Sequence, residues 1–528
     1  DPLKNPKHGF KLNFTGDYGQ SSLKYPLFEG SAAQEFDDLL LRADFNSSWR
    51  HWSDVANNGN GAYQRSRGTR TRYAWSQETM RAMGHPAPRN RYCHLFINGL
   101  YWGTYDFSEQ PTETFAQTHY PSPAGHDIYE QGLLRAGSDV AYKAMLAITN
   151  LADNANYLRI QQYLDVPQFI DYTLLHFFVG HQDWGNTKNW YAIRPRVAGD
   201  LGRFRYIPWD QECILLEENV NRVPNAGGST DVPSGLHTKL DDNPQFRLDF
   251  ADRAHRHLVA PEGVLTPLAN IQRWQKWEAL LDNPIVLESM RWGDYRRDVH
   301  QYADGTYQLY TREQHWIAEN NRLENSYFLH RTATLLSQLR TAGLYPAVDA
   351  PEFRQGSVSG PLLASRTVPD GFVLAMRNPG GAGTIYYTTN GVDPRVYFSG
   401  QVAPGAMAYS SPLTLTATLT LKARVFHNNT WSALNEATFS VAALGLPLAI
   451  TEIMYNPTGG DAFEFLELQN LGSTVVDLSG FSFAGIDYIF PPGSILNPGA
   501  VILLASSADP NAFRARYPAV AVFGWFGG

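Results

Sequence analysis

Short runs of alternating hydrophobic and polar residues predict several strands in the first part of the chain. Phe10, Leu12 and Phe14 alternate with polar residues, with Lys11 on the opposite face, as in a strand with one apolar side. The stretch 90–110 holds two alternating runs joined by Asn98-Gly99, which favours a tight hairpin turn. The pattern predicts two more short strands, at 189–195 and 204–212.

Helical spacing of apolar residues lies between and after these strands. A helix is predicted over 73–84, ending at Gly84 with Pro86 just beyond, a common stop signal. Another starts with Asp165 as N-cap and continues to about residue 180 with apolar residues at helical spacing. The region 261–340 is mainly helical, and 312–340 is its longest piece. Strands, a hairpin and a helical half together predict a two-lobed α+β domain.

The chain changes character twice after this domain. Residues 343–360 are rich in Gly, Pro and Ser, as in a linker, and short alternating strands with turn residues follow. A second break lies near residues 443–450. We therefore predict three domains at 1–342, 343–445 and 446–528, the first α+β and the other two all-β.

Composition limits the classes of function. The chain has 528 residues and a net charge of -8, which argues against nucleic acid as a partner. It contains no apolar run of about eighteen residues, so no transmembrane segment is predicted. Cys93 and Cys213 are its only cysteines and are expected to be buried thiols, which excludes a thiolate zinc site. The arginine-rich stretch 64–73 is interpreted as a solvated helix entrance rather than an anion site.

Two polar clusters follow apolar elements closely. Asp183 comes just after the helix that Asp165 starts, and Asn189 stands six residues later at the start of a strand. Asp210 and Glu212 end the next strand. If that strand continues through them, their carboxylates share a face with Cα atoms about 6–7 Å apart. Oxygen ligands of this kind suit Mg²⁺.

The order of these residues matches the needs of phosphoryl transfer. One Asp orients the attacking hydroxyl, an Asn holds metal, and a second acid bridges the metal to the phosphates. Asp183, Asn189 and Asp210 with Glu212 fit these roles. Lys11, on an early strand, fits a phosphate contact, and Glu109, after the hairpin, fits a contact to the nucleotide base.

The sequence resembles the CotH kinase family, atypical kinases named for a spore-coat protein. The matching stretches are 9–14, 39–49, 80–110, 180–194 and 204–212, and residues 288–297 resemble a later family segment. The resemblance implies a protein Ser/Thr kinase that uses ATP with Mg²⁺ or Mn²⁺. It assigns Asp183 as the catalytic acid, Asn189, Asp210 and Glu212 to the metal, and Lys11 and Glu109 to ATP.

Two departures from the family pattern bear on activity. Glu212 replaces the family's second Asp, which keeps a carboxylate but lengthens it. No glycine-rich phosphate loop precedes Lys11, and we expect the N-terminus to be truncated. The glycine-rich stretches 57–63 and 224–230 lack the GK[ST] of a P-loop and are interpreted as ordinary loops.

The C-terminal modules resemble other families. Residues 384–395 with 419–432 are similar to the small C-terminal β-sandwich of chitobiase and β-hexosaminidase, and 448–505 resembles a lamin tail domain, an immunoglobulin-like sandwich. In bacteria such modules accompany secreted proteins. The resemblance therefore implies an extracellular or cell-surface location, a protein acceptor from the envelope or coat, and contact of these modules with a surface polymer.

Other functions stay open. The first is a kinase-like surface scaffold or adhesion protein without turnover. The second is a glycoside hydrolase, which the paired carboxylates and the aromatic fraction of 13% would suit. A serine hydrolase is disfavoured because Val358 stands where its nucleophile would be in GSVSG, and a zinc hydrolase because no HExxH occurs. The histidine pairs His176 with His181 and His255 with His257 are interpreted as core or surface residues.

Overall fold

The computed structural model describes residues 5–31, 33–51, 64–184, 188–224, 231–295, 308–441, 447–483 and 485–528. The chain forms two compact units. The first comprises Asp1–Arg366, Val373–Leu413 and Leu419–Phe439, and the second Thr367–Phe372, Thr414–Thr418 and Ser440–Gly528. The two glycine-rich stretches that the sequence predicts to be ordinary loops, 57–63 and 225–230, lie outside the described residues.

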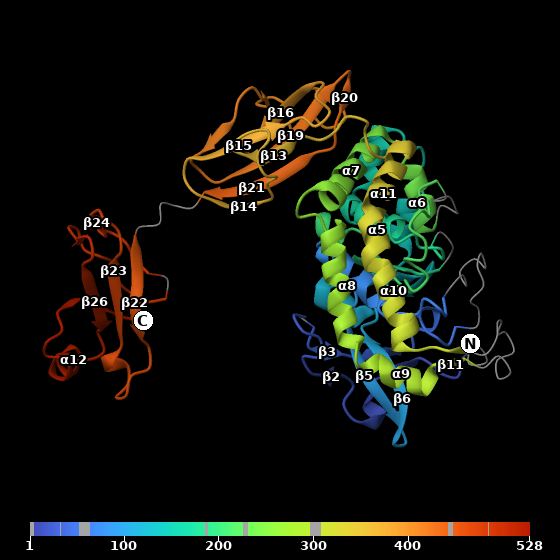
Figure 1. Ribbon diagram of the computed structural model, residues 1–528, viewed down its shortest axis with the longest axis horizontal. Helices are drawn as coiled ribbons and strands as arrows, with labels where there is room; N and C mark the ends of the chain where they lie inside the picture. Colours follow the sequence, from blue (N-terminus) through green and yellow to red (C-terminus); the bar gives the residue numbers. More distant parts are fainter. Residues whose placement is uncertain are drawn as a thin grey trace. The chain divides into compact units, whose positions relative to one another are not determined.

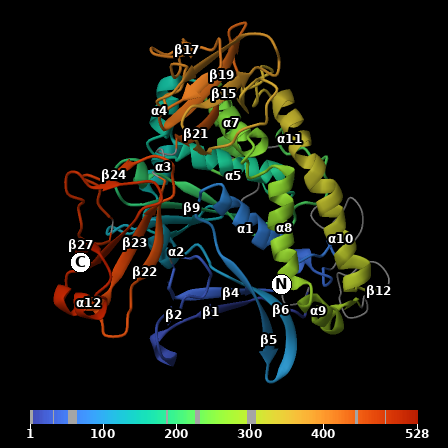
Figure 2. The same cartoon turned by 60° about the vertical axis from the view of Figure 1, so that its left-hand side comes forward.

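The hairpin predicted at 90–110 forms one side of a four-stranded antiparallel sheet (Figure 2). Its strands are β5 (Asn90–Ile97) and β6 (Leu100–Ser108), and its turn residues Asn98 and Gly99 have φ of 50° and 79°. Both values lie in the left-handed region that a two-residue hairpin turn needs. The sheet continues in the order β1-β4-β6-β5, with β1 at Phe10–Asn13 and β4 at Asp38–Arg42. The strand and hairpin predictions are confirmed.

A second four-stranded sheet has the order β10-β9-β7-β8. Its strands are β7 (His126–Glu130), β8 (Leu133–Ala136), β9 (Trp190–Pro195) and β10 (Arg205–Pro208). All three pairings are antiparallel. The strand predicted at 204–212 is therefore shorter than expected and stops at Pro208. A separate two-stranded sheet consists of β2 (Leu23–Lys24) and β3 (Glu35–Phe36).

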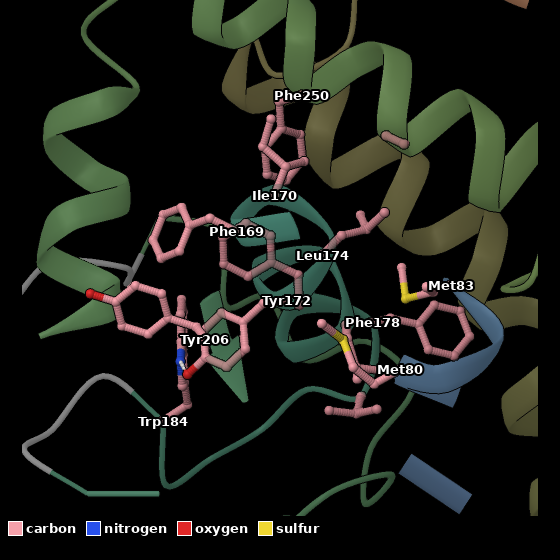
Figure 3. Close-up of a cluster of buried hydrophobic side chains, with 14 of the residues drawn as sticks. Met80, Met83, Phe169, Ile170, Tyr172, Leu174, Phe178, Trp184, Tyr206 and Phe250 are labelled. Carbon is pink, nitrogen blue, oxygen red and sulfur yellow. Dashed lines mark hydrogen bonds between the residues drawn. The ribbon is translucent and has the colours of Figure 1, made fainter. Parts of the chain in front are cut away.

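Helix α5 (Val166–Phe178) lies in the core of the first unit. The Asp165 side chain accepts a hydrogen bond from the Gln168 N–H, which confirms the predicted N-cap. Figure 3 shows its apolar side chains packed around Tyr206 of β10. The rings of Phe169 and Tyr206 are 5.1 Å apart between centroids. This packing fixes the end of α5 relative to the end of β10, the two places from which the predicted site residues come.

The other helices of the first unit surround α5 and the sheets (Figure 1). They are α1 (Arg72–Ala82), α2 (Glu113–His119), α3 (Val140–Leu146), α4 (Asn154–Ile160), α6 (Pro233–Leu240), α7 (Pro244–Ala254), α8 (Pro267–Leu281), α9 (Pro284–Trp292), α10 (Ile317–Arg322) and α11 (Phe328–Ala342). Two π-helical segments, Arg312–Trp316 and Leu323–Tyr327, join α10 and α11 into one column over 312–342. This column confirms the longest predicted helical piece. The short strands β11 (Asp294–Tyr295) and β12 (Gln308–Leu309) pair beside α9.

The arginine-rich stretch 64–73 is buried, so its interpretation as a solvated helix entrance is wrong. Arg70 is 2% exposed and Arg72 is fully buried. The Arg70 guanidinium bonds to Glu288 and Asp44 at 3.2 and 3.3 Å, and Arg72 bonds to Glu319 at 2.9 Å. These carboxylates come from distant parts of the chain, which local charge patterning does not reveal.

An all-β module follows the helical part, and most of its residues belong to the first unit. Its strands are β13 (Glu352–Gln355), β14 (Arg366–Val368), β15 (Phe372–Arg377), β16 (Thr384–Thr388), β17 (Met407–Ala408), β18 (Leu413–Leu415), β19 (Leu419–His427), β20 (Thr430–Trp431) and β21 (Asn435–Val441). The central strands have the order β21-β19-β16-β17, and β13 pairs with β15. The side chain of Arg424, on β19, is 1% exposed and binds Asp393 and, from α7, Asp252 at 2.6 and 2.5 Å. This pairing ties the module to the helical part.

The second unit is also mainly β. Its larger sheet has the order β22-β23-β26-β27, and β24 pairs with β25. The elements are β22 (Leu448–Met454), β23 (Phe465–Asn470), β24 (Val476–Asp477), β25 (Ile495–Leu496), β26 (Val501–Ser506), α12 (Pro510–Arg516) and β27 (Val522–Phe526). Leu468, Leu504 and Phe526 belong to its core. An α+β region followed by all-β modules confirms the predicted fold class.

No helix in the described ranges is long and apolar enough to cross a membrane.

The buried Arg424 provides a test of this packing. Arg424→Ala leaves Asp252 and Asp393 without their counter-ion, which costs about 2–3 kcal/mol, less than a fully buried pair because Asp393 is 33% exposed. Chemical denaturation followed by fluorescence measures the loss. The matched control is Lys422→Ala on the same strand, whose pair with Glu436 is partly exposed and contributes about 0–1 kcal/mol. Equal losses from both variants would contradict the anchoring role of Arg424.

Candidate functional site

The segment after α5 and the turn after β10 lie side by side. The Gln182 N–H donates to the Cys213 carbonyl, and the Trp209 N–H donates to the Asn189 carbonyl, both at 3.2 Å. Burial raises the pKa of the Cys213 thiol well above its usual range, and the charges of three acids, Glu212, Asp183 and Asp210, raise it further. The two hydrogen bonds thus bring the segment that holds Asp183 next to the turn that holds Asp210 and Glu212.

Asn189 orients Asp183. Its side-chain N–H donates to Asp183 Oδ2 at 3.1 Å and to the Asp183 carbonyl at 3.4 Å. Asn189 is 4% exposed and has a φ of 68°, a left-handed conformation that Asn tolerates better than most residues. The amide therefore holds the carboxylate in a defined direction just before β9.

The argument that placed Asp210 and Glu212 on one face of a strand is wrong. The strand ends at Pro208, Asp210 has a φ of 51°, and the Glu212 N–H donates to the Asp210 carbonyl at 2.9 Å. The chain therefore turns here, whereas alternation of faces requires an extended chain. The two carboxylates nevertheless meet, because both bind the same arginine.

That arginine is Arg42, at the end of β4. One of its nitrogens, Nη2, lies 2.6 Å from Asp210 Oδ1 and 2.6 Å from Glu212 Oε1. The guanidinium also lies over two rings, 4.0 Å from the centroid of Tyr73 and 5.3 Å from that of Trp209. Burial favours its neutral form, yet the charges of Glu212 and Asp210 outweigh burial and hold the pKa of Arg42 well above its ordinary value.

Glu212 uses both of its oxygens in this arrangement. Its Oε1 accepts from Arg42, and its Oε2 accepts from the Asn46 N–H at 2.8 Å. Burial first, and then the charge of Asp210, raise the pKa of Glu212 to about 7. Glu212 therefore links Arg42 to the main chain of Asn46, in addition to being a predicted metal ligand.

The donor set of Asn189, Asp210 and Glu212 consists of oxygen ligands, which suit Mg²⁺ chemically. Within the described ranges, no group of three or more His, Cys, Asp or Glu side chains is arranged to hold a metal ion. A divalent ion at Asp210 and Glu212 would share these carboxylates with Arg42. The metal-binding role of the three residues stays a prediction.

A cavity of about 590 Å³ opens beside Glu212, a volume typical of small-molecule sites. Its lining includes three cationic residues, Lys7, Lys11 and Arg42. Lys11 is partly exposed, and its Nζ lies 2.8 Å from Asp38 Oδ2. The structure therefore places the predicted phosphate-binding lysine on the same cavity as Glu212.

Glu109 lies apart from this cavity, directly after β6. It is 3% exposed, and its Oε2 accepts from the Arg89 N–H at 2.8 Å. Burial raises its pKa to about 7. It lines a separate space of about 10 Å³, enough for about one water molecule. Its contact with a nucleotide base stays a prediction.

Sequence reasoning missed two cations of the site. Arg42 had a weak signal, since it ends the apolar run Leu39–Leu41 with a charge. Lys7 precedes the first predicted strand and had none. Its buried Nζ lies 2.5 Å from Glu288 Oε1 and 2.7 Å from the Thr104 carbonyl, and burial lowers its pKa to about 7.

The expected thiols and histidines can also be placed. Cys93 and Cys213 are free thiols, but only Cys213 is buried and Cys93 is half-buried. His176 and His181 are buried core residues with their Nδ1 atoms 2.9 Å apart. Burial lowers the pKa of both. Neither the two cysteines nor these two histidines add a metal site to the one predicted at Asn189, Asp210 and Glu212.

Fold and site together define a multidomain protein, with an α+β region that holds acids and cations at one cavity and with β modules that follow it in the sequence. Comparison with protein families is more specific. The model described as CotH kinase protein matches residues 60–331, which is more than half of the chain. The chain belongs to the CotH kinase protein family. This match includes Glu109, Asp183, Asn189, Asp210 and Glu212, and begins after Lys11 and Arg42.

Two further family models match the β modules. The model described as Fn3 associated matches residues 374–438, and Lamin Tail Domain matches 443–525. The predicted order of the domains is confirmed, with the Fn3-associated model at the place of the chitobiase-like module. A search of curated proteins found no match.

The pairing of Arg42 predicts a pH-dependent stability difference. Because the folded-state pKa of Glu212 is raised, the folded protein binds a proton as pH falls through about 7, and the unfavourable ionisation of this site disappears. Arg42→Gln should therefore cost about 3 kcal/mol at pH 8, where Glu212 is ionised, and much less at pH 5. Thermal and chemical denaturation across this range measure the difference.

The control is Arg135→Gln, which removes a half-exposed arginine paired with Glu130. Its effect should be small and nearly independent of pH. A loss from Arg42→Gln that is the same at both pH values would show that the acids are not ionised partners of Arg42.

Proposed function

We propose that this chain is a protein kinase that transfers the γ-phosphate of ATP, with Mg²⁺ or Mn²⁺, to serine or threonine of an envelope or coat protein. The observation that carries the proposal is the meeting of Asp210 and Glu212 at Arg42, because Glu212 and Arg42 also line a cavity of about 590 Å³ together with Lys11. Asp183 lies on the segment whose Gln182 N–H donates to the carbonyl of Cys213, the residue after Glu212. Phosphoryl transfer requires positive charge to bind the phosphates, acids to bind the metal ion, and a further acid to orient the acceptor hydroxyl.

The cations would hold the triphosphate. Lys7 and Lys11 come from the N-terminal segment and β1, and Arg42 comes from β4, the strand that pairs with β1. Asn189, Asp210 and Glu212 would hold the divalent ion. When bound, Mg²⁺ neutralises charge on the phosphate oxygens. Arg42 would hold both carboxylates in place before nucleotide arrives, and its charge favours the ionised form of Glu212.

Asp183 would act on the acceptor. Its carboxylate orients the serine or threonine hydroxyl and takes its proton while the hydroxyl oxygen bonds to the γ-phosphorus. The bond from that phosphorus to the oxygen bridging to the β-phosphate breaks, and ADP leaves with the electron pair. Asn189 keeps the Asp183 carboxylate in the required direction through the bond at 3.1 Å.

The β modules support a location outside the cytoplasm. The Fn3-associated and lamin tail matches are consistent with the secreted and surface proteins in which such modules occur. In this proposal the modules attach the kinase to a surface polymer, and the acceptor is a protein of the same envelope or coat.

A second candidate is a kinase-like scaffold or adhesion protein without turnover. One observation favours it: Arg42 already neutralises Asp210 and Glu212 with a fixed, buried cation. The glycoside hydrolase alternative has less support, because it needs two carboxylates about 5–10 Å apart with a sugar between them. Asp210 and Glu212 instead share one guanidinium nitrogen.

The first functional prediction concerns nucleotide binding. ATP with Mg²⁺ or Mn²⁺ should raise the melting temperature of the wild-type protein, since a ligand that binds only the folded state stabilises it. Asp210→Ala should abolish this shift. The control Asp200→Ala removes an acid whose side chain is 84% exposed and should keep the shift. Unchanged nucleotide affinity of Asp210→Ala in calorimetry would argue against the metal role.

The second functional prediction separates chemistry from binding. Asp183→Asn should keep the ATP-dependent thermal shift but lose about 10²–10⁴-fold in phosphate transfer to a serine-rich acceptor, because the amide cannot take a proton. Transfer of radiolabel from ATP measures the rate. Transfer at the wild-type rate would refute the role of Asp183, and ATP binding without transfer by the wild-type protein would favour the scaffold.

A further inference from the structure

A larger groove lies along strand β5, away from the cavity beside Glu212. Its volume is about 880 Å³, and its lining shares no residue with that of the cavity beside Glu212. Six consecutive residues, 89–94, form one wall. The opposite wall consists of Lys276, Trp277 and Leu280 of α8 and the loop 26–30. A groove that follows consecutive strand residues runs along the edge of the strand.

Strand β5 is an edge of its sheet. In the order β1-β4-β6-β5 it pairs only with β6 among the strands of the described residues. No main-chain hydrogen bond given for the described residues joins 90–97 to any other segment. Alternate N–H and C=O groups of such an edge point away from the partner strand and can pair with another chain. Six extended residues span about 17 Å, enough for a short peptide.

The groove is cationic in a chain whose net charge is -8. Arg81, Arg89, Arg91 and Lys276 line it, and Glu29 is the one carboxylate among its lining residues. Two more acids act on these cations from nearby, since Glu78 pairs with Lys276 at 2.8 Å and Glu109 interacts with Arg81 and Arg89. Four cations against three acids leave a positive groove.

The guanidinium groups of the three arginines donate their hydrogen bonds to main-chain carbonyls. Arg89 donates to the carbonyls of Glu29 and Gly30 at 3.0 and 2.7 Å, and Arg91 to that of Leu27 at 3.3 Å. Arg81 donates to the carbonyls of Ala87 and Pro88. These bonds position the guanidinium groups without neutralising their charge. Among the described residues, no salt bridge joins these three arginines to an acid.

The floor of the groove has both apolar surface and free donors. The rings of Tyr92 and Trp277 meet edge to face at 5.8 Å between centroids. Within the described part of the chain, Arg89 Nε and Trp277 Nε1 are buried N–H groups without a hydrogen-bond partner. Buried donors without partners are uncommon, and a bound chain would reach these two only if the side chains turned toward the groove.

We infer that the β5 edge is a docking site for an extended, acidic segment of the protein acceptor, which adds to the sheet as a further strand. Its main chain pairs with β5, and its alternate carboxylates face Arg89 and Arg91. This mode of strand addition derives affinity from main-chain hydrogen bonds and specificity from side-chain pockets. The inference rests on the proposed function only in taking the occupant to be the acceptor.

The test uses a fluorescein-labelled peptide of alternating glutamate and valine with a central serine, because such a sequence favours an extended chain. Fluorescence anisotropy with the whole protein, without ATP or metal, should show saturable binding. A second peptide of the same sequence is N-methylated at alternate residues on one edge. It keeps the charge but loses the N–H groups that pair with β5, and should bind at least about tenfold more weakly. Equal binding of both peptides would overturn strand addition.

The protein variant is Arg91→Glu, whose side chain is exposed on β5. Reversing this charge should weaken peptide binding at least about tenfold. The matched control is Arg377→Glu, on β15 and half-exposed, which should bind as the wild type does. Circular dichroism and the melting temperature verify that both variants fold. Equal affinity of Arg91→Glu and Arg377→Glu for the peptide would overturn the assignment of the groove.

Two further outcomes are distinguishable. Light scattering that shows a dimer disrupted by Arg91→Glu, with no peptide bound, would assign the edge to a second copy of the chain and overturn the proposal. If the protein transfers phosphate, Arg91→Glu should raise KM for the acidic acceptor and leave kcat and KM for ATP unchanged. Peptide binding without any phosphate transfer would refute the proposed kinase activity but support the docking site. Phosphate transfer without peptide binding would support the kinase activity but refute the docking site.

Discussion

The contact of one guanidinium nitrogen with two carboxylates determines the geometry of the site. Arg42 belongs to the first sheet, and Asp210 and Glu212 follow the last strand of the second. Two carboxylates this close, of which Glu212 is buried, would otherwise repel each other and favour protonation. The arginine therefore joins the two sheets, and its charge opposes the rise in the pKa of Glu212 that burial causes. The packing of α5 against β10 then brings Asp183 and Asn189 to the same place.

Buried arginines paired with carboxylates also occur elsewhere in the first unit. Arg70 binds Asp44 and Glu288, Arg72 binds Glu319, and Arg424 binds Asp252 and Asp393. Each arginine is buried and each partner comes from a distant segment. Buried pairs of this kind add little net stability but disfavour other arrangements of the same elements, because a misplaced charge would be left unpaired. The sheet β1-β4-β6-β5 contributes to two separate hollows, because β1 and β4 line the cavity beside Glu212 and β5 lines the groove.

Part of the site was accessible to sequence reasoning. Asp183, Asn189, Asp210 and Glu212 were recognisable because each follows an apolar element at a short distance and carries an oxygen ligand. The reason given for the pairing of Asp210 and Glu212 was wrong, since the chain turns at Asp210 instead of continuing as a strand. Glu109 was placed by analogy of position after the hairpin, but it is buried against the main chain of Arg89.

The sequence by itself determined what depends on neighbouring residues. The turn at Asn98-Gly99, the helix that Asp165 begins, the long helical column and the order of the domains all follow from local patterns. Only the tertiary structure decided which charges meet. Arg42 and Asp210 are 168 residues apart, and Lys7 and Glu288 are 281 apart. No periodicity spans such separations. A buried arginine and a solvated one have the same letter in the sequence, and only packing distinguishes them.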